Sequence, residues 1–168
     1  NNSEALLDER IFEFISFARK KLPYALLEIK TNGILLNEKN FIELYNSGLD
    51  KLCINDYTPS GKLSKRISKL KTKILSTERF RKTNNLEIYG RLNNEVLGSR
   101  AGNSPNKKIT KNPLANQPCF RPSEMMTITP EGNVSVCSED QYCEFNMGNL
   151  ITSNVEELWY SDKWSKLR

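Results

Sequence analysis

The chain has 168 residues, of which 38% are hydrophobic and 27% are charged, and this balance indicates one ordinary globular domain or two small ones. No apolar run approaches the ~20 residues that a membrane-spanning helix needs, and no signal-peptide pattern opens the chain. The sequence therefore predicts a cytoplasmic protein without a membrane partner. The chain contains no histidine, which excludes Ser–His–Asp and Cys–His catalysis and every zinc site that uses imidazole.

The first 92 residues alternate between helical and strand patterns, with short links between them. Asp8 is the expected N-cap of the first helix, because its side chain can accept a hydrogen bond from the first turn. The predicted helices cover residues 8–21, 37–47 and 63–75, and the predicted strands cover residues 24–30, 51–55 and 86–92. Such alternation favours an α/β fold with a parallel sheet and right-handed crossovers. Three strands cannot close an eight-stranded barrel, but they can form part of one.

A basic run contributes much of the formal net charge of +5. It contains Lys62, Lys65, Arg66, Lys69, Lys71, Lys73, Arg79, Arg81 and Lys82, opposed only by Glu78. Such a run suits a surface for an acidic partner or nucleic acid, or a solvated helix face. The charges do not alternate with a series of aromatic residues, as a stacking platform would require, so the solvated face is favoured and nucleic acid is not expected.

The composition changes after residue 97, which divides the chain into three predicted parts. Residues 1–97 form the β/α region, and residues 98–118, which are rich in Gly, Pro, Asn and Lys, form an extended linker. Residues 119–168 form a second, smaller unit. In that unit we predict strands at 125–128 and 133–137 around a turn at 130–132, which is a β-hairpin, and a helix at 155–167.

Four cysteines occur in the chain, and three of them lie in its last third. Clustered cysteines in a cytosolic protein favour metal binding over a disulfide. Any one of them could instead be a small buried hydrophobic residue, and Cys53, on an apolar strand, is expected to be so. Cys119 and Cys137 bracket the predicted hairpin, which folds back at Gly132 and brings distant thiolates side by side.

Cys119 and Cys137 are therefore candidate ligands of an iron–sulfur cluster, although a zinc site with the same thiolates is an alternative. Cys143 follows Cys137 by six positions and can reach the same cluster, but its spacing is not diagnostic. A four-iron cluster needs four ligands. The fourth would be Asp140, an exogenous thiol or a cysteine beyond Arg168.

Residues 119–168 resemble the SPASM and twitch domains, which are auxiliary [4Fe–4S] modules of radical SAM enzymes. The spacing CX12GX4C from Cys119 through Gly132 to Cys137 is similar to their opening signature. The other similar segments are SRAGN at 99–103, PCFRP at 118–122, TPEGNV at 129–134, GNL at 148–150 and VEELW at 155–159. Several agreements in the right order make this resemblance specific.

The first half resembles the middle of a radical SAM barrel. The segment NSEALLD at 2–8 is similar to the GGEP(L)LxD segment that follows the second barrel strand, although Ala5 replaces the usual proline. This resemblance implies that Ser3 and Glu4 hold the amino group of S-adenosylmethionine.

Two later segments extend the resemblance. The segment IKTNG at 29–33 is similar to the xTNG that closes the third strand, which implies that Thr31 and Asn32 lie beside the cofactor. Asn55 ends the next predicted strand, and the resemblance implies that it faces the cofactor ribose. These positions agree with the rule that sites in parallel α/β folds gather at the carboxyl ends of strands.

The resemblance implies an enzyme that cleaves S-adenosylmethionine to a 5′-deoxyadenosyl radical, which abstracts hydrogen from a peptide or small-molecule substrate. The auxiliary [4Fe–4S] cluster would relay an electron or help hold the substrate, and an electron-donor protein is an expected partner. No catalytic residue is assigned. The cofactors supply the radical chemistry and the protein places them.

Two departures from the family pattern bear on this reading. The CxxxCxxC that holds the catalytic cluster is absent from the sequence, and so are the downstream cysteines of SPASM-type domains. We therefore expect an internal fragment that is inactive alone and carries most of the auxiliary domain. The alternatives are a stand-alone thiolate–metal module without radical chemistry, and a structural α/β domain with unligated thiols.

Overall fold

The computed structural model describes residues 4–81, 85–95, 118–140 and 142–168. The chain forms two compact units, one within Ser3–Glu95 and the other within Val96–Arg168. The predicted linker lies almost wholly outside the described residues, so its bounds stay a prediction. Within the described ranges, no helix is both long enough and apolar enough to cross a membrane.

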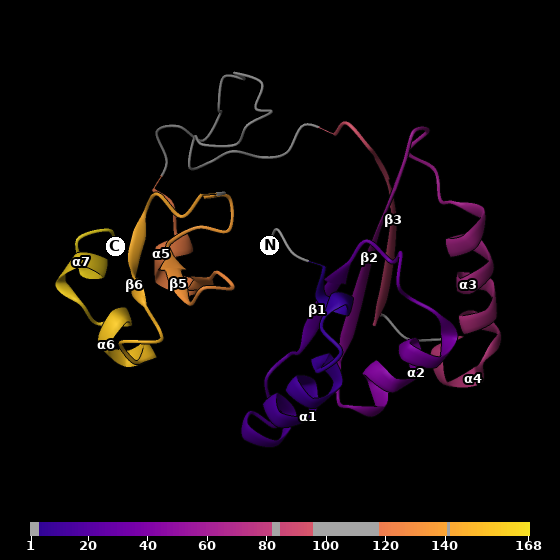
Figure 1. Cartoon of the computed structure of the whole chain (residues 1–168), viewed down its shortest axis with the longest axis horizontal. Coiled ribbons are helices and arrows are strands. Elements are labelled where there is room, and N and C mark those ends of the chain that lie inside the picture. Colours follow the sequence, from indigo (N-terminus) through magenta and orange to yellow (C-terminus); the bar gives the residue numbers. More distant parts are fainter. Residues whose placement is uncertain (1–3, 82–84, 96–117, 141) are drawn as a thin grey trace. The chain divides into compact units, whose positions relative to one another are not determined.

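The first unit is a three-stranded parallel sheet covered by helices (Figure 1). Its elements are the 3-10 helix η1 (Ala5–Leu7), α1 (Ile11–Lys21), β1 (Glu28–Thr31), α2 (Glu38–Asn46), β2 (Lys51–Thr58), α3 (Lys65–Ser76), α4 (Glu78–Arg81) and β3 (Leu86–Leu92). The strands lie in the order β1-β2-β3, and both neighbouring pairs are parallel. The predicted α/β class and parallel sheet are therefore confirmed.

One face of this sheet is apolar. Ile29 of β1 lies opposite Leu52 of β2, and Ile54 of β2 lies opposite Ile88 of β3. The side chains that join them in the core come from α1, α2, α3 and α4, and they are Ile15, Phe41, Leu44, Ile67, Ile74 and Phe80. Figure 1 shows α2, α3 and α4 together on one side of the strands. Sequential strands with helices on a single face are the arrangement of a (β/α) barrel segment, not of a doubly wound sheet.

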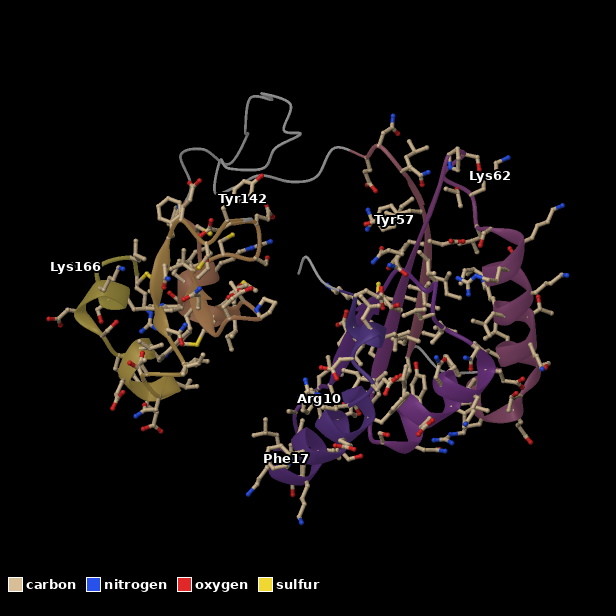
Figure 2. All side chains as sticks on the ribbon, viewed as in Figure 1. Arg10, Phe17, Tyr57, Lys62, Tyr142 and Lys166 are labelled. Atoms are coloured by element: carbon tan, nitrogen blue, oxygen red, sulfur yellow. The ribbon has the colours of Figure 1, made fainter. Side chains whose placement is uncertain are left out.

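The opposite face of the sheet is polar, because successive side chains of a strand point to opposite sides. This polar face consists of Glu28 and Lys30 from β1, Lys51, Cys53, Asn55 and Tyr57 from β2, and Glu87, Tyr89 and Arg91 from β3. Lys51 pairs with Glu87 at 2.8 Å across the strands. Figure 2 shows Tyr57 on the side of the sheet away from α3. In a barrel, this polar face would line the interior.

The start of β1 differs from the prediction. The strand begins at Glu28, not at Tyr24, which is fully exposed. Arg19 of α1 explains the difference, because its Nη1 donates to the carbonyl oxygens of Pro23 at 2.8 Å and Ala25 at 2.9 Å. These bonds hold the residues after α1 in a turn.

The start of α1 also differs from the prediction. Arg10, not Asp8, occupies the N-cap position. Asp8 instead accepts hydrogen bonds from the backbone nitrogen of Arg10 at 3.0 Å and from its Nε at 2.9 Å. The side-chain hydrogen bond from Arg10 lowers the pKa of Asp8 to about 2. Asp8 therefore pairs with the residue at the N-cap position, whose own side chain makes no capping hydrogen bond.

The second unit contains a small antiparallel sheet and short helices. Its elements are α5 (Arg121–Glu124), β4 (Thr127–Ile128), β5 (Asn133–Ser135), β6 (Asn146–Asn149), α6 (Val155–Trp159) and α7 (Asp162–Ser165). The strand order is β4-β5-β6, and the pairs are antiparallel. The predicted hairpin is confirmed as β4–β5. Gly132 forms its turn with a φ of 80°, and its N–H donates to the carbonyl of Thr129 at 2.9 Å.

The prediction of one helix over 155–167 is wrong, because two short helices occupy these residues. Helix α6 ends at Trp159. The hydroxyl of Ser161 then accepts a hydrogen bond from the backbone nitrogen of Trp164 at 3.3 Å, which caps the start of α7. Trp164 is fully buried, and its Nε1 donates to the carbonyl of Pro122 at 2.6 Å. The small core of this unit consists of Val134, Met147, Leu158 and Trp164.

Candidate functional site

Glu4 joins the segment before η1 to the carboxyl end of β1. Its Oε1 accepts hydrogen bonds from the hydroxyl of Thr31 at 2.6 Å and from the backbone nitrogen of Leu6 at 3.1 Å. Its Oε2 accepts one from the backbone nitrogen of Asn32 at 2.7 Å. Since a carboxylate oxygen accepts about two hydrogen bonds, Oε2 keeps an acceptor position for a ligand such as an ammonium group.

Thr31 positions Glu4 and is itself shielded. Only 3% of Thr31 is exposed, its hydroxyl donates to Glu4, and its oxygen accepts a hydrogen bond from the backbone nitrogen of Gly33 at 2.9 Å. The hydroxyl has therefore used its single donor. Of the predicted cofactor residues, Glu4, Thr31 and Asn32 are brought together at the carboxyl end of β1. Ser3 lies outside the described residues.

The turn after β1 depends on Gly33. Its φ is 73°, and a Cβ at this position would lie 2.9 Å from Cγ2 of Ile54 and 3.0 Å from Cδ1 of Ile67. Only glycine adopts this backbone conformation without strain and also leaves room for the core. The side chain of Asn32 closes the turn by accepting a hydrogen bond from the backbone nitrogen of Ile34 at 2.8 Å. This geometry presents the backbone nitrogen of Asn32 to Glu4.

Asn55 lies on the polar face, toward the carboxyl end of β2. Its Oδ1 accepts a hydrogen bond from Nε of Arg91 at 3.0 Å, and Arg91 pairs with Glu95 at 2.9 Å. Nδ2 of Asn55 makes a long contact of 3.9 Å with the sulfur of Cys53. Because Arg91 engages the amide oxygen, Nδ2 is the group that can donate to a ligand. Sequence reasoning missed Arg91, whose only signal was its position near the end of the neighbouring strand.

The segments that carry Cys119 and Cys137 are tied together by Arg121. Cys119 lies two residues before Arg121, the first residue of α5. Nη1 of Arg121 lies 3.8 Å from Sγ of Cys137 and donates to Oγ of Ser138 at 2.9 Å. Nη2 of Arg121 lies 3.4 Å from Oε1 of Glu139. Sequence reasoning did not select Arg121, although it stands inside the PCFRP motif.

Cys137 has a second donor at its sulfur, the backbone nitrogen of Glu139 at 3.4 Å. Cys137 is half-buried and Cys119 is exposed, so neither thiol is locked inside an apolar core. Hydrogen bonds from N–H groups to ligand sulfurs are a common feature of iron–sulfur sites. The donor chemistry at these two cysteines therefore fits such a cluster.

Asp140 shapes the loop after Cys137. The carboxylate is buried and accepts hydrogen bonds from the hydroxyl of Ser135 at 2.8 Å and from the backbone nitrogens of Glu144 at 3.0 Å and Phe145 at 2.9 Å. These bonds connect the end of β5 to the approach to β6. They assign Asp140 a structural role and do not favour it as the fourth cluster ligand.

Cys143 and Cys53 differ from the other two cysteines. Burial raises the pKa of the Cys143 thiol, and the negative charges of Asp140 and Glu131 raise it further. Its backbone has a φ of 53°, which is unusual for a residue other than glycine. Burial also raises the pKa of Cys53, which is 5% exposed as the sequence predicted. Without a bound metal, both environments favour the protonated thiol, so a metal that binds Cys143 would have to displace its proton.

No group of three or more cysteine, aspartate or glutamate side chains in the described parts of the chain is close enough together to hold a metal ion. The ligand set of Cys119, Cys137 and Cys143 stays a prediction.

Comparison with known proteins adds to this geometry. Residues 119–168 match SPASM, an iron–sulfur cluster-binding domain. The chain is also 27% identical over 165 residues to the S-adenosyl-L-methionine-dependent 2-deoxy-scyllo-inosamine dehydrogenase of Niallia circulans, across 98% of this chain and 62% of that protein. Residues 119–168 are therefore a SPASM-type segment, and the chain as a whole is similar to an S-adenosyl-L-methionine-dependent dehydrogenase. The resemblance seen in the sequence is thereby confirmed.

Two crystal structures share the fold. BtrN in complex with AdoMet and 2-DOIA has a TM-score of 0.78 at 24% identity, over 98% of this chain and 61% of that one. SeMet BtrN in an open conformation has a TM-score of 0.68 at 22% identity, over 99% of this chain and 59% of that one. The chain thus spans about three fifths of the length of these relatives. The SPASM domain contains Arg121, Asp140 and the three candidate ligands.

Proposed function

We propose that this chain is part of a radical SAM enzyme that removes hydrogen from a small molecule. The observation that carries the proposal is the carboxylate of Glu4, which three hydrogen bonds fix at the edge of the parallel sheet with one acceptor position left on Oε2. The SPASM match and the relative in Niallia circulans, named as a dehydrogenase, support the same function.

Residues of the first unit would bind and orient S-adenosylmethionine. Oε2 of Glu4 would accept a hydrogen bond from the ammonium group of the cofactor, in a charge-assisted contact. Thr31 and the backbone of Asn32 would keep Glu4 in place, and Nδ2 of Asn55 would donate to an oxygen of the cofactor. Ser3 is proposed beside Glu4 from the sequence pattern alone.

The substrate proposed is a small molecule that carries hydroxyl or amine groups. The polar face of the sheet offers partners for such groups, including the phenols of Tyr57 and Tyr89, which are 47% and 45% exposed. Tyr89 also donates to Glu87 at 3.1 Å, which orients the phenol. The dehydrogenase relative acts, by its name, on 2-deoxy-scyllo-inosamine, and this favours a small molecule over a peptide.

In the second unit, Cys119, Cys137 and Cys143 are the proposed ligands of the auxiliary cluster. When bound, the iron–sulfur clusters and S-adenosylmethionine supply the one-electron and radical chemistry, for which the protein provides binding and orientation. We also propose a cytoplasmic location and an electron-donor protein as partner, because reduced thiols and low-potential clusters suit a reducing compartment.

The test is the binding of S-adenosylmethionine by the full-length protein, reconstituted with iron and sulfide without oxygen. Glu4→Gln should weaken binding about tenfold or more in equilibrium dialysis, because the charge-assisted contact is lost. Glu9→Gln is the matched control on an exposed residue, and it should bind as the wild type does. Production of 5′-deoxyadenosine should fall in parallel.

Two outcomes would contradict the proposal. Equal affinity in wild type and Glu4→Gln, with unchanged iron content, would remove Glu4 from the site. Iron or zinc bound without any affinity for S-adenosylmethionine would instead indicate a thiolate–metal module without radical chemistry.

A further inference from the structure

We propose that Arg121 tunes the reduction potential of the SPASM cluster, making the cluster easier to reduce without being one of its ligands. This inference rests on the proposed function, since it requires that Cys137 bind the cluster. Arg121 would act on the cluster indirectly, through its contact with the sulfur of Cys137.

The position of Arg121 supports this role. Its Nη1 is 3.8 Å from the sulfur of Cys137, and the guanidinium is held in place by Oγ of Ser138 at 2.9 Å and by Oε1 of Glu139 at 3.4 Å. The side chain of Arg121 is 30% exposed and that of Glu139 is 22% exposed. The positive charge is therefore fixed beside the sulfur and partly shielded from solvent.

The direction of the effect follows from charge. Reduction adds one electron to the cluster, from dithionite in the experiment below, and no bond is made or broken. The product carries one more negative charge, so a nearby cation and N–H donors to sulfur stabilise the reduced form more than the oxidised form. Arg121 should raise the potential, whereas the carboxylate of Glu139 should lower it.

The shape of arginine matters as well as its charge. The planar guanidinium presents several N–H groups in a fixed fork, and here they reach Cys137, Ser138 and Glu139 at once. A lysine has a single ammonium on a flexible stem, so it would keep the charge but not all three contacts. Arg121→Lys should therefore retain only part of the effect.

The experiment compares three variants of the full-length, reconstituted protein: Arg121→Met, Arg121→Lys and Glu139→Gln. Iron per chain is counted first, and the midpoint potential is then measured by redox titration followed by EPR. The signal that does not respond to added S-adenosylmethionine is assigned to the SPASM cluster. The signal that does respond is assigned to the catalytic cluster. Its midpoint potential is the internal control and should be the same in all variants.

We expect opposite shifts. At a fixed potential, Arg121→Met should lower the ratio of reduced to oxidised SPASM cluster about tenfold, which corresponds to a fall of about 59 mV in the midpoint. Glu139→Gln should raise the ratio, and Arg121→Lys should fall between wild type and Arg121→Met. Opposite signs identify an electrostatic effect, because mere damage to the loop would not raise the potential in Glu139→Gln.

Three results would overturn the inference. Unchanged midpoints in variants with full iron content would show that Arg121 does not act on the cluster. If Arg121→Met loses iron, unchanged midpoints in Arg121→Lys and Glu139→Gln would assign it a structural role only. A wild-type protein without a second cluster would overturn the proposed ligands themselves, and the iron count distinguishes that case.

Discussion

The two units of the chain are stabilised in different ways. Among the described residues, eleven buried hydrophobic side chains form one cluster between the sheet and the helices of the first unit, whereas four form the core cluster of the second unit. In the second unit, the polar side chain of Asp140 connects the loop to β5. Small domains with little core often depend on a metal for stability. The difference suggests that the sheet unit is stable without cofactors and that the SPASM unit gains stability from its cluster.

The core of the first unit gives the largest expected effect. Phe41 is fully buried and packs at 5.0 Å against both Tyr45 and Phe80, measured between ring centroids. Phe41→Ala should lower the free energy of unfolding of this unit by about 3–5 kcal/mol, because it leaves a cavity in the core. Hydrogen exchange read separately from the two units measures the change.

The control for this prediction is the same substitution on the surface. Phe17 is 63% exposed on α1, and it is labelled in Figure 2. Phe17→Ala should change stability by less than about 0.5 kcal/mol. Equal loss of protection in both units of Phe41→Ala would contradict the view that they are stabilised separately.

The loop of the second unit gives a smaller effect. Asp140→Ala removes the acceptor of the backbone N–H groups of Glu144 and Phe145 and leaves the hydroxyl of Ser135 with only the carbonyl of Cys137, at 3.4 Å. We expect a loss of about 1–3 kcal/mol, visible as faster hydrogen exchange between β5 and β6. Glu144→Ala, at an exposed position nearby, should have little effect. Protection unchanged in Asp140→Ala would show that polar contacts do not hold this loop.

The pH dependence of the first unit provides a third test. Burial raises the pKa of Tyr45 to about 12, since the folded state disfavours its charged form. An ordinary tyrosine titrates near pH 10, so the stabilisation is complete below about pH 10 and is lost as the pH rises toward 12. Unscreened, a shift of this size would be worth about 2.7 kcal/mol. Solvent screening of this half-buried side chain reduces the expected loss to about 2 kcal/mol or less, and Tyr45→Phe should remove this part of the pH dependence. Tyr24→Phe, at a fully exposed position, should leave the profile unchanged.

The smallest expected effect concerns the hydroxyl that holds Glu4. Thr31→Val keeps the shape of the side chain but removes the hydrogen bond to Glu4 and the acceptor for the backbone nitrogen of Gly33. Affinity for S-adenosylmethionine should fall about fivefold, which is about 1 kcal/mol. Thr31→Ser keeps the hydroxyl and should bind nearly as well as the wild type. Equal affinities in both variants would show that Thr31 does not position Glu4.

The sequence predicted the first unit well because its apolar periodicity reports directly on burial. It failed at Tyr24, which has strand-like neighbours, because the turn there is fixed by Arg19, a residue of another element. Arg19 is only four and six residues from these acceptors, but the apolar pattern does not report which carbonyls its guanidinium binds. The TNG turn was visible in the sequence, but its reason, the lack of room at Gly33 beside Ile54, required the packed structure.

In the candidate sites too, the sequence predicted some residues and the structure was needed to find others. Motif spacing selected Glu4, Cys119 and Cys137, and the structure adds the residues that hold them. Arg91 and Arg121 were not selected from the sequence, because the side chains that they contact, Asn55 and Cys137, lie far from them along the chain. The two-helix end of the second unit was also missed, because the break depends on the hydroxyl of Ser161.

The most direct test of the account is an iron and sulfide count on the full-length protein with the double substitution Cys119→Ala and Cys137→Ala. Cys53→Ala is the control, because that cysteine is buried in the first unit. The account predicts a loss of about four iron and four sulfide per chain in the double variant and none in the control. An unchanged count in the double variant would show that these cysteines do not hold the cluster and would contradict the central claim.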